Sequence, residues 1–441
     1  MDDRIISHLL ELVDKGHRIC TDSRQANEGR IFFALRGDHF DGNQFAEKAL
    51  QSGCNLAVID NPKFHMGNNS LLVEDALKTL QRLGQARRRQ IDIPVIGITG
   101  SNGKTTTKEL LQAILSEHFS SAATKGNLNN HIGVPLSLLS FPPESDCAIV
   151  EMGANHPGEI AELCEIAMPT HGLITNIGQA HLEGFGSVEA VARAKNELYE
   201  YLYKTHGILF VNQDDPRLKQ MTRGLEAINY GLDLQNHCSG EVISSFPFLQ
   251  VRFMVNKDFG KAKQGTYGEV HSMLTGTYNF ENIMAGITVG LYFGVEPEKI
   301  IRAIREYTPE NHRSQIIQTS RNTVLMDAYN ANPSSMDAAL NNLALFNDRP
   351  GAVFLGDMLE LGSVANEAHR RVMDRVKQMQ IPLQVFVGKH FAATCETEED
   401  ALVFTHVSDA VEWLRKNPIR GYNVLVKGSR GIRMERLLEY L

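Results

Sequence analysis

A chain of 441 residues is too long for a single compact core, and its length alone suggests roughly three domains. Apolar residues make up 42% of the chain, which is ordinary for globular proteins and argues against extensive disorder. The net charge of −8 is spread along the sequence, which disfavours nucleic acid or an anionic membrane as a main partner.

The sequence also bounds where the protein acts. No stretch approaches the roughly 18 continuous apolar residues of a membrane-spanning helix, so no membrane insertion is expected. The first residues lack the apolar core of a signal peptide. The six cysteines are dispersed without a CxxC pair, which favours reduced structural thiols over a zinc site. We therefore expect a cytoplasmic protein.

The first predicted domain, residues 1–90, has a mixed α/β pattern. Apolar runs at residues 31–35 and 56–59 predict strands, and residues 43–52 predict a helix between them. The basic run 87–89 is expected to be a solvated helix end, because cations suit helix C-termini.

The second predicted domain, residues 91–312, alternates short apolar runs with helical stretches. Strands are predicted at residues 95–98, 147–150, 172–174 and 207–211, and the last three runs end in polar residues. This alternation favours a parallel sheet with helices on both faces. Ligands of such sheets bind beyond the carboxyl ends of the strands, where these polar residues fall.

A glycine-rich loop follows the first of these strands. Residues 97–106 read Gly-Ile-Thr-Gly-Ser-Asn-Gly-Lys-Thr-Thr, and a helix is expected over 104–118. Backbone N–H groups of such a loop point at phosphate oxygens, and the helix dipole favours negative charge. Lys104 would reach the β- and γ-phosphates of ATP, and the Thr105 hydroxyl would bind Mg²⁺. The standard pattern has glycine where this chain has Ile98.

Three further side chains are candidates for chemistry near this loop. Glu151 ends the 147–150 run as a natural Mg²⁺ ligand, the alternative being a surface glutamate beside a turn. His181, beyond the 172–174 strand, is as readily structural as functional. Lys195 falls on the apolar stripe of a helix expected over 187–202. A lysine at this position must extend its ammonium to solvent (snorkelling), pair with an anionic group, or be uncharged. A neutral amine can form a metal-binding carbamate with carbon dioxide, although spacing alone favours snorkelling.

The third predicted domain, residues 313–441, restarts the alternation. Strands are predicted at residues 324–327, 352–357, 385–388 and 424–427, each before a helix-like stretch. The predicted fold class is therefore α/β in three domains. They are a small N-terminal α/β domain, a central P-loop ATPase domain with a parallel sheet, and a C-terminal Rossmann-like domain.

Together these motifs resemble the Mur ligase family, the ATP-dependent amide-forming enzymes of bacterial peptidoglycan synthesis. Residues 99–106 resemble the family's ATP signature, and residues 274–282 resemble its LxGxHNxxN motif, with Tyr278 in place of the usual histidine. The resemblance implies the ATP contacts Gly100, Ser101, Asn102, Gly103, Lys104, Thr105, Thr106, Asn282, Arg313 and Asp327.

The same resemblance implies the metal and catalytic residues. Two Mg²⁺ ions are expected, one held by Thr105 and Glu151 and a second near His181 and a carbamylated Lys195. Lys104, Glu151, His181 and Lys195 are the implied catalytic residues.

Motifs of the third domain resemble the last cytoplasmic ligase of the family's series. They lie at residues 327–333, 355–362 and 426–431. The Asp-Asn-Pro-Arg motif of the diaminopimelate-adding ligase is absent. The resemblance therefore implies the substrates UDP-N-acetylmuramoyl-tripeptide and D-alanyl-D-alanine, joined through an acyl phosphate by a monomeric enzyme whose domains close around them.

The implied substrate contacts are Ser23, Arg24, Asn129, Asn130, His131, Tyr329, Asn330, Lys427, Ser429 and Arg430. A plain polar turn at 125–131 and a plain glycine-rich turn at 427–431 are the alternatives. Two other functions also stay open. One is a family ligase that adds diaminopimelate, lysine or glutamate, and the other is a P-loop ATPase switch that ligates nothing.

Overall fold

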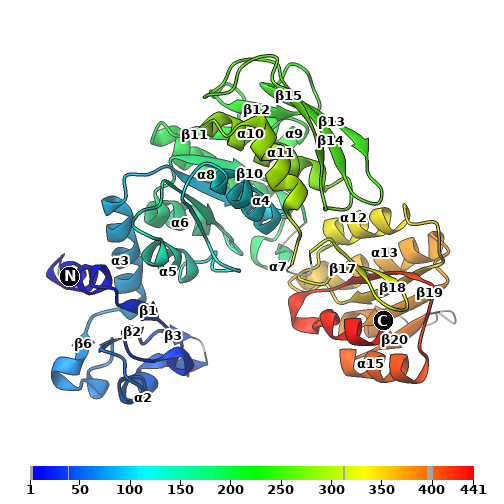
Figure 1. Ribbon diagram of the computed structural model, residues 1–441. Helices are drawn as coiled ribbons and strands as arrows, with labels where there is room; N and C mark the ends of the chain where they lie inside the picture. The colour runs from blue at the N-terminus through cyan, green and yellow to red at the C-terminus, as the bar shows by residue number, and fades with distance from the viewer. Residues whose placement is uncertain (1–2, 38, 180, 311–312, 395–400) are drawn as a thin grey trace.

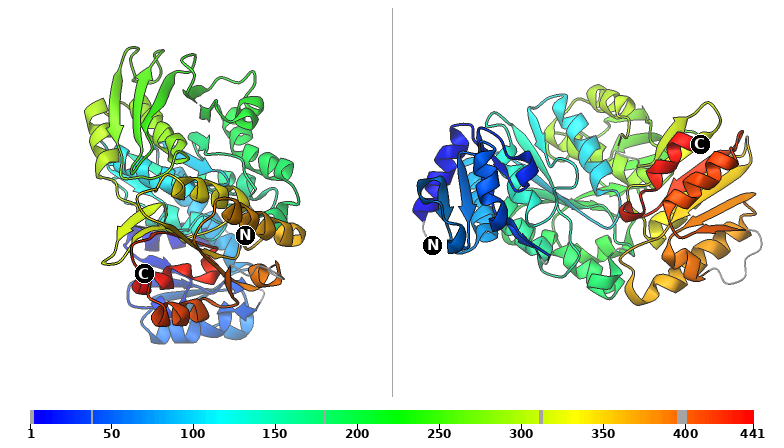
Figure 2. Two further views of the ribbon diagram at one scale, coloured as in Figure 1. Left: turned by 90° about the vertical axis from the view of Figure 1, so that its right-hand side faces the viewer. Right: turned by 90° about the horizontal axis from the view of Figure 1, so that it is seen from below.

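The computed structural model describes residues 3–37, 39–179, 181–310, 313–394 and 401–441. Three α/β units follow one another in chain order along an arc, with the N-terminal and C-terminal units at opposite ends (Figures 1 and 2). Each unit has its own sheet and buried apolar core, which confirms the predicted three-domain α/β fold class. The boundaries at residues 90 and 312 stay predictions. None of the helices in the described residues combines the length and the apolar character that spanning a bilayer requires.

The N-terminal unit is a four-stranded parallel sheet. Its order is β1 (Arg18–Cys20), β2 (Arg30–Phe33), β5 (Leu56–Ile59) and β6 (Ser70–Leu72). Helices α1 (Asp3–Asp14) and α3 (Ala76–Gln90) cover one face, and α2 (Ala46–Gln51) covers the other. A small hairpin, β3 (Arg36–Gly37) and β4 (Phe40–Asp41), lies beside them. The two strands and the helix predicted here are confirmed.

Helix α3 joins the first two units, and its basic end differs from the prediction. The helix ends at Gln90, but Arg87 and Arg88 are buried. Arg88 donates to the carbonyl oxygens of Ala167 at 3.0 Å and Met168 at 3.1 Å in the central unit. The predicted solvated helix end is therefore wrong, because α3 packs against α5 (Gly133–Ser140) and α6 (Glu159–Ala167).

The central unit is a nine-stranded sheet in the order β15-β14-β13-β12-β11-β10-β7-β9-β8. Its parallel part contains β7 (Val95–Thr99), β8 (Ser121–Ala123), β9 (Cys147–Glu151), β10 (His171–Ile174), β11 (Ile208–Asn212), β12 (Ile228–Gly231) and β13 (Cys238–Ser244). The four strands predicted here are confirmed. Antiparallel β14 (Gln250–Val255) and β15 (Tyr267–His271) extend the edge. Both alternate buried and exposed residues, as one-sided antiparallel strands do.

Helices cover both faces of this sheet, as predicted. On one face lie α4 (Lys104–Ser116), α10 (Asn279–Phe293) and α11 (Pro297–Glu306). On the other lie α5, α6, α8 (Val188–Lys204) and α9 (Pro216–Met221), with the short α7 (Leu182–Phe185) before α8. Helices α4 and α8 are the two that the sequence predicted.

The C-terminal unit is a six-stranded sheet in the order β16-β17-β21-β18-β19-β20. The strands are β16 (Gln315–Gln318), β17 (Thr323–Asp327), β18 (Gly351–Gly356), β19 (Leu383–Val387), β20 (Leu402–Phe404) and β21 (Asn423–Lys427), and only β16 runs antiparallel to its neighbour. Helices α12 (Pro333–Leu343), α13 (Ala365–Gln378) and α14 (Lys389–Thr394) pack on one face, and α15 (Val407–Lys416) packs on the other. All four predicted strands are confirmed.

Candidate active site

A cavity of about 700 Å³ lies between the central and C-terminal units. Its walls come from the loops after β7, β8, β9, β10, β17, β18 and β21 and from the start of α10, so the carboxyl ends of two sheets face one another. The predicted site residues that line it are Ser101, Asn102, Gly103, Lys104, Thr105, Thr106, Asn129, Asn130, His131, Glu151, His181, Asn282, Arg313, Asp327, Tyr329, Asn330, Lys427, Ser429 and Arg430.

Four predicted site residues do not line this cavity. Gly100 lies within the glycine loop, and Lys195 lies in α8. Ser23 and Arg24 belong to the N-terminal unit, in a short 3₁₀ turn at Ser23–Gln25. The Arg24 side chain is 86% exposed and pairs with Asp22 at 2.7 Å. The structure thus places the predicted UDP contacts in a different unit from the ATP loop.

The glycine loop after β7 is shaped by two left-handed glycines. Gly100 has a φ of +143°, and a Cβ there would lie 2.0 Å from the Thr175 hydroxyl. Gly103 has a φ of +80°, and a Cβ there would lie 2.4 Å from Asn282 Oδ1. Ile98, at the position where the standard pattern has glycine, lies inside β7 and is fully buried. The unusual spacing therefore follows from where the turn begins.

Lys104 and Thr105 begin α4 directly after this loop. Lys104 Nζ donates to the loop's own carbonyls, 2.6 Å from Gly100 O and 3.2 Å from Ser101 O. Burial lowers the pKa of Lys104 to about 8, against the opposing charge of Glu151. The ammonium therefore lies over the loop at which a phosphate group would bind.

Glu151 receives two side-chain hydrogen bonds at the end of β9. Thr105 Oγ1 donates to Glu151 Oε2 at 2.9 Å, and Asn129 Nδ2 donates to Glu151 Oε1 at 2.8 Å. A hydroxyl and a carboxylate are ligands that suit Mg²⁺. Among the described residues no group of three His, Cys, Asp or Glu side chains could hold a metal, so an ion here would need water or phosphate oxygens as well.

Lys195 is buried in the central unit. Its side chain is 1% exposed, so the snorkelling that helical spacing favoured is wrong. Nζ lies 3.5 Å from Ala154 O and 5.5 Å from the centre of the Phe185 ring. Burial, and then the charge of Lys104, lowers the pKa of Lys195 to about 7. Burial therefore favours the neutral form of the Lys195 amine far more than an exposed lysine would show.

His181 contacts the C-terminal unit. Its Nδ1 forms a short hydrogen bond with the carboxylate of Glu360, in the loop after β18. The backbone N–H of Glu183 also donates to Glu360 O at 3.1 Å. The hydrogen bond from His181 lowers the pKa of Glu360. Sequence reasoning did not assign Glu360, although it lies in the 355–362 motif.

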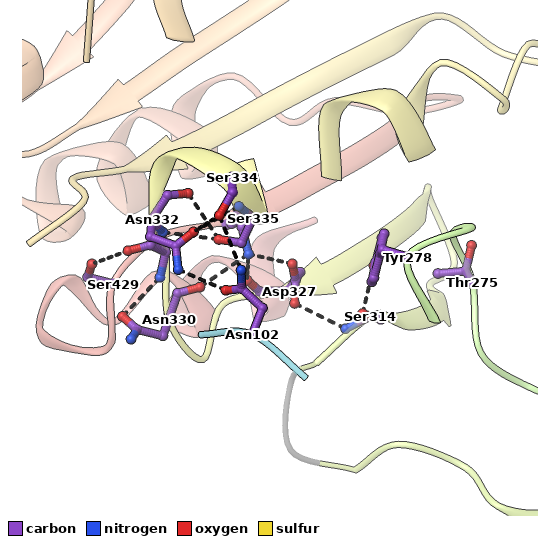
Figure 3. Close-up of polar contacts among 12 residues, drawn as sticks. Asn102, Thr275, Tyr278, Ser314, Asp327, Asn330, Asn332, Ser334, Ser335 and Ser429 are labelled. Carbon is purple, nitrogen blue, oxygen red and sulfur yellow. Dashed lines mark hydrogen bonds and ion pairs between the residues drawn. The ribbon is translucent and has the colours of Figure 1, made fainter. Parts of the chain in front are cut away.

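Asn102, at the tip of the glycine loop, also reaches the C-terminal unit (Figure 3). Asn332 Nδ2 donates to Asn102 Oδ1 at 2.8 Å, and Asn102 Nδ2 donates to Ser334 Oγ at 3.2 Å. Asn332 and Ser335 form a capping box at the start of α12. The tip of the predicted ATP loop and a helix N-terminus of the next unit are thus directly bonded, a contact that the sequence did not indicate.

Two predicted ligand contacts in the C-terminal unit bind each other. Lys427 Nζ, at the end of β21, pairs with the Asp327 carboxylate at the end of β17 and donates to Asn330 O at 3.1 Å. The family resemblance implied that Asp327 contacts ATP and that Lys427 contacts a substrate. Neighbouring parallel strands bring these two side chains together, in register.

Aromatic residues form another part of the wall. The Arg313 guanidinium stacks on the Tyr329 ring at 3.6 Å from its centre, and Arg430 lies 5.4 Å from the same ring. Tyr278, which replaces the family histidine, forms a 2.7 Å hydrogen bond with Ser314 Oγ (Figure 3). Burial raises the pKa of Tyr278, so its hydroxyl stays protonated.

Glu281 is a wall residue that the sequence did not indicate. It lies in the first turn of α10 and lines the cavity. Burial raises its pKa to about 7, and the charges of Asp215 and Asp214 add to this effect. It occupies a variable position of the LxGxHNxxN motif, so no local pattern marked it.

Comparisons with known proteins agree with this architecture. Residues 15–91 match a model described as "Mur ligase family, catalytic domain", residues 98–290 match "Mur ligase middle domain", and residues 312–430 match "Mur ligase, glutamate ligase domain". The chain is 32% identical to the UDP-N-acetylmuramoyl-tripeptide–D-alanyl-D-alanine ligase of Bacillus subtilis (strain 168), over 96% of this chain and 93% of that protein.

Solved structures agree as well. A crystal structure of MurF from Acinetobacter baumannii superposes with a TM-score of 0.81 at 31% identity, covering 96% of this chain and 92% of that one. MurF ligase from Thermotoga maritima in complex with ADP also gives a TM-score of 0.81, at 26% identity with 97% of each chain covered. The cavity, the three units and these matches together show that the chain belongs to the Mur ligase family.

Proposed function

We propose that this protein joins D-alanyl-D-alanine to the free carboxyl group of a UDP-N-acetylmuramoyl-tripeptide, with conversion of ATP to ADP and phosphate. The product is the UDP-muramoyl-pentapeptide used in peptidoglycan synthesis. The observation that carries the proposal is the shared cavity, in which the glycine loop and Glu151 face the loops after β17 and β21. The full-length similarity to ligases with this named activity supports it.

The reaction must activate a carboxylate that does not acylate an amine by itself. Transfer of the γ-phosphoryl group of ATP to this carboxylate gives an acyl phosphate, and the dipeptide amine then displaces phosphate. The first step brings anions together, so neutralising and positioning groups dominate catalysis. We assign that role to Lys104 and to the backbone N–H groups of the glycine loop, at the start of α4.

Magnesium ions, when bound, would neutralise phosphate charge during the transfer. Thr105 and Glu151 would hold one ion, since Thr105 Oγ1 and Glu151 Oε2 lie next to each other beside the glycine loop. We further propose a second ion near His181 and a carbamylated Lys195. The neutral Lys195 amine would add to carbon dioxide and lose one proton, leaving a carbamate anion. The lowered pKa of Lys195 supports this step.

The remaining contacts belong to the two ligands of the ligation. We propose that Asn129, Asn130 and His131 contact the precursor, whose UDP end would lie toward Ser23 and Arg24. Tyr329, Asn330, Lys427, Ser429 and Arg430 would meet the incoming dipeptide. Because an acyl phosphate hydrolyses readily, we expect the C-terminal unit to close over the cavity during turnover. We also propose that the enzyme acts as a monomer in the cytoplasm, which sedimentation and fractionation would test.

Product mass spectrometry tests the proposal. The protein is incubated with ATP, Mg²⁺, D-alanyl-D-alanine and a UDP-muramoyl tripeptide ending in either diaminopimelate or lysine. The expected result is a UDP-pentapeptide, with one phosphate released per product and none from Lys104→Met. Phosphate release without the precursor would favour a plain ATPase. Product with free diaminopimelate, lysine or glutamate on UDP-muramoyl acceptors with shorter peptides, tested in parallel, would favour another ligase of the family.

A further inference from the structure

A second lysine lies one turn beyond Lys104 on α4. The Lys108 side chain is 2% exposed, and it does not line the cavity. Its Nζ lies 3.5 Å from Glu151 Oε2, whose side chain is equally buried, and donates to Gly126 O at 3.2 Å. The ammonium therefore lies between the carboxylate of Glu151, which is proposed to bind magnesium, and a different segment of the chain.

A buried ammonium needs an explanation at this position. Removing a cation from water costs free energy that one ion pair does not always repay, and an apolar side chain of similar length would fill the same space. The two groups that Lys108 binds therefore point to its role. One is Glu151. The other is the backbone of residues 124–131, which we call the acceptor loop, between β8 and α5.

The acceptor loop is attached to Glu151 at two points, Thr124 and Asn129. The backbone N–H of Glu151 donates to Thr124 Oγ1 at 3.1 Å, and Asn129 Nδ2 donates to its Oε1 at 2.8 Å. Between these two points, residues 125–128 are exposed. The buried Lys108 side chain contacts the middle of this exposed stretch, where its Nζ donates to Gly126 O. It thereby connects the loop to the same carboxylate a third time.

We propose that Lys108 is a positioning residue that holds the acceptor loop in register with Glu151, and so sets the site of the UDP-muramoyl precursor relative to the ATP loop. The inference rests on the proposed function, because the acceptor loop is the segment proposed to contact the precursor. The dipeptide is proposed to bind the C-terminal unit, which Lys108 does not touch. The loss of the Lys108 side chain should therefore weaken binding of the precursor and leave binding of the dipeptide unchanged.

The test compares Lys108→Met with the wild-type enzyme. The loss of a hydrogen bond from a charged donor shifts an equilibrium by about tenfold or more, so the loop should occupy the arrangement that binds the precursor about tenfold less often. We expect the KM for the UDP-tripeptide to rise by at least about tenfold, with the KM for D-alanyl-D-alanine within about threefold. In the protein without ligands, amide hydrogen exchange of residues 125–131 should become at least about tenfold faster, and that of β7 should not change.

The matched control is Leu115→Ala, at the far end of the same helix and fully buried. It lowers stability without touching the loop, so it should leave both KM values and the loop exchange unchanged. Lys108→Arg, which keeps the cation with a different head group, should give a smaller rise in the precursor KM, above about threefold. It carries the test if Lys108→Met does not fold.

Three results would overturn the role of Lys108. The first is an unchanged precursor KM together with unchanged loop exchange in Lys108→Met, or in Lys108→Arg if Lys108→Met does not fold. The second is an equal rise in both KM values. The third is a raised precursor KM and faster loop exchange in Leu115→Ala as well. If the wild-type enzyme makes no product from the UDP-tripeptide, the proposed function fails. In that case the exchange measurement still decides whether Lys108 holds the loop.

Discussion

The bond between the ATP loop and the C-terminal unit allows a quantitative prediction. Asn102→Ala removes two cross-unit hydrogen bonds, to Asn332 and to Ser334. It should leave the loop itself intact, because the loop is held by the Asn102 backbone. Thr175 Oγ1 donates to Asn102 O at 2.6 Å, and Asn102 N donates to Asn176 Oδ1 at 3.1 Å. The substitution therefore acts on the interface between the units.

The expected size follows from the two bonds. A neutral hydrogen bond contributes about 0.5–1.5 kcal/mol net, so two contribute about 1–3 kcal/mol to the arrangement in which the units are joined. That range corresponds to a roughly 5- to 150-fold change in the ratio of joined to released molecules. If the joined arrangement is the one that reacts, kcat falls by up to this factor. The dissociation constant of ADP should change by less than about threefold, since the loop backbone keeps its shape.

Two assays check this prediction. Coupled phosphate release gives kcat, and calorimetric titration gives the ADP affinity. Ser334→Ala, which removes one of the two bonds, should have a smaller effect, and a double-mutant cycle with Asn102→Ala should show a coupling of about 0.5–1.5 kcal/mol. An unchanged kcat in Asn102→Ala, or a loss matched by weaker ADP binding, would refute the reasoning. Closure further predicts different small-angle scattering profiles for the ligand-free and fully liganded enzyme, and identical profiles would contradict it.

Other predictions concern the metal sites and the junction of the first two units. Lys195→Ala should lose activity and regain part of it with short carboxylic acids, and full activity without them would exclude the carbamate. Because the pKa of Lys195 falls from 10.5 to about 7, the unfolded state binds more protons between these values. Stability from this group should therefore rise with pH above 7, and Lys195→Met should flatten the slope in denaturant melts. Bicarbonate should raise wild-type activity more at pH 8 than at pH 6, and equal stimulation would count against a reactive amine. Thr105→Val should raise the Mg²⁺ concentration for half-maximal rate at least about tenfold, and an unchanged requirement would remove Thr105 as a ligand. Arg88→Met should lower the free energy of unfolding in urea by about 3 kcal/mol, since the carbonyl oxygens of Ala167 and Met168 lose a charged donor, and a loss under about 1 kcal/mol would mean that they find other partners.

Local patterns predicted much of the fold. The buried runs of the central and C-terminal sheets are continuous apolar segments, and each predicted strand there is present. The glycine loop was readable because the turn needs left-handed glycines at Gly100 and Gly103 next to a strand and a helix. The edge strands β14 and β15 were not predicted, since their alternating burial leaves only short apolar signals.

The sequence by itself thus determined the three α/β units, the ATP loop and the identity of Glu151, His181 and Lys195 as candidates. Tertiary structure decided their partners. Asn102 forms a hydrogen bond with Asn332, 230 positions away, and His181 forms one with Glu360, 179 positions away. Such pairs leave no spacing signal, because they form only where separate units meet. For the same reason the sequence placed Arg88 in solvent, whereas the packing of α3 on the central unit buries it.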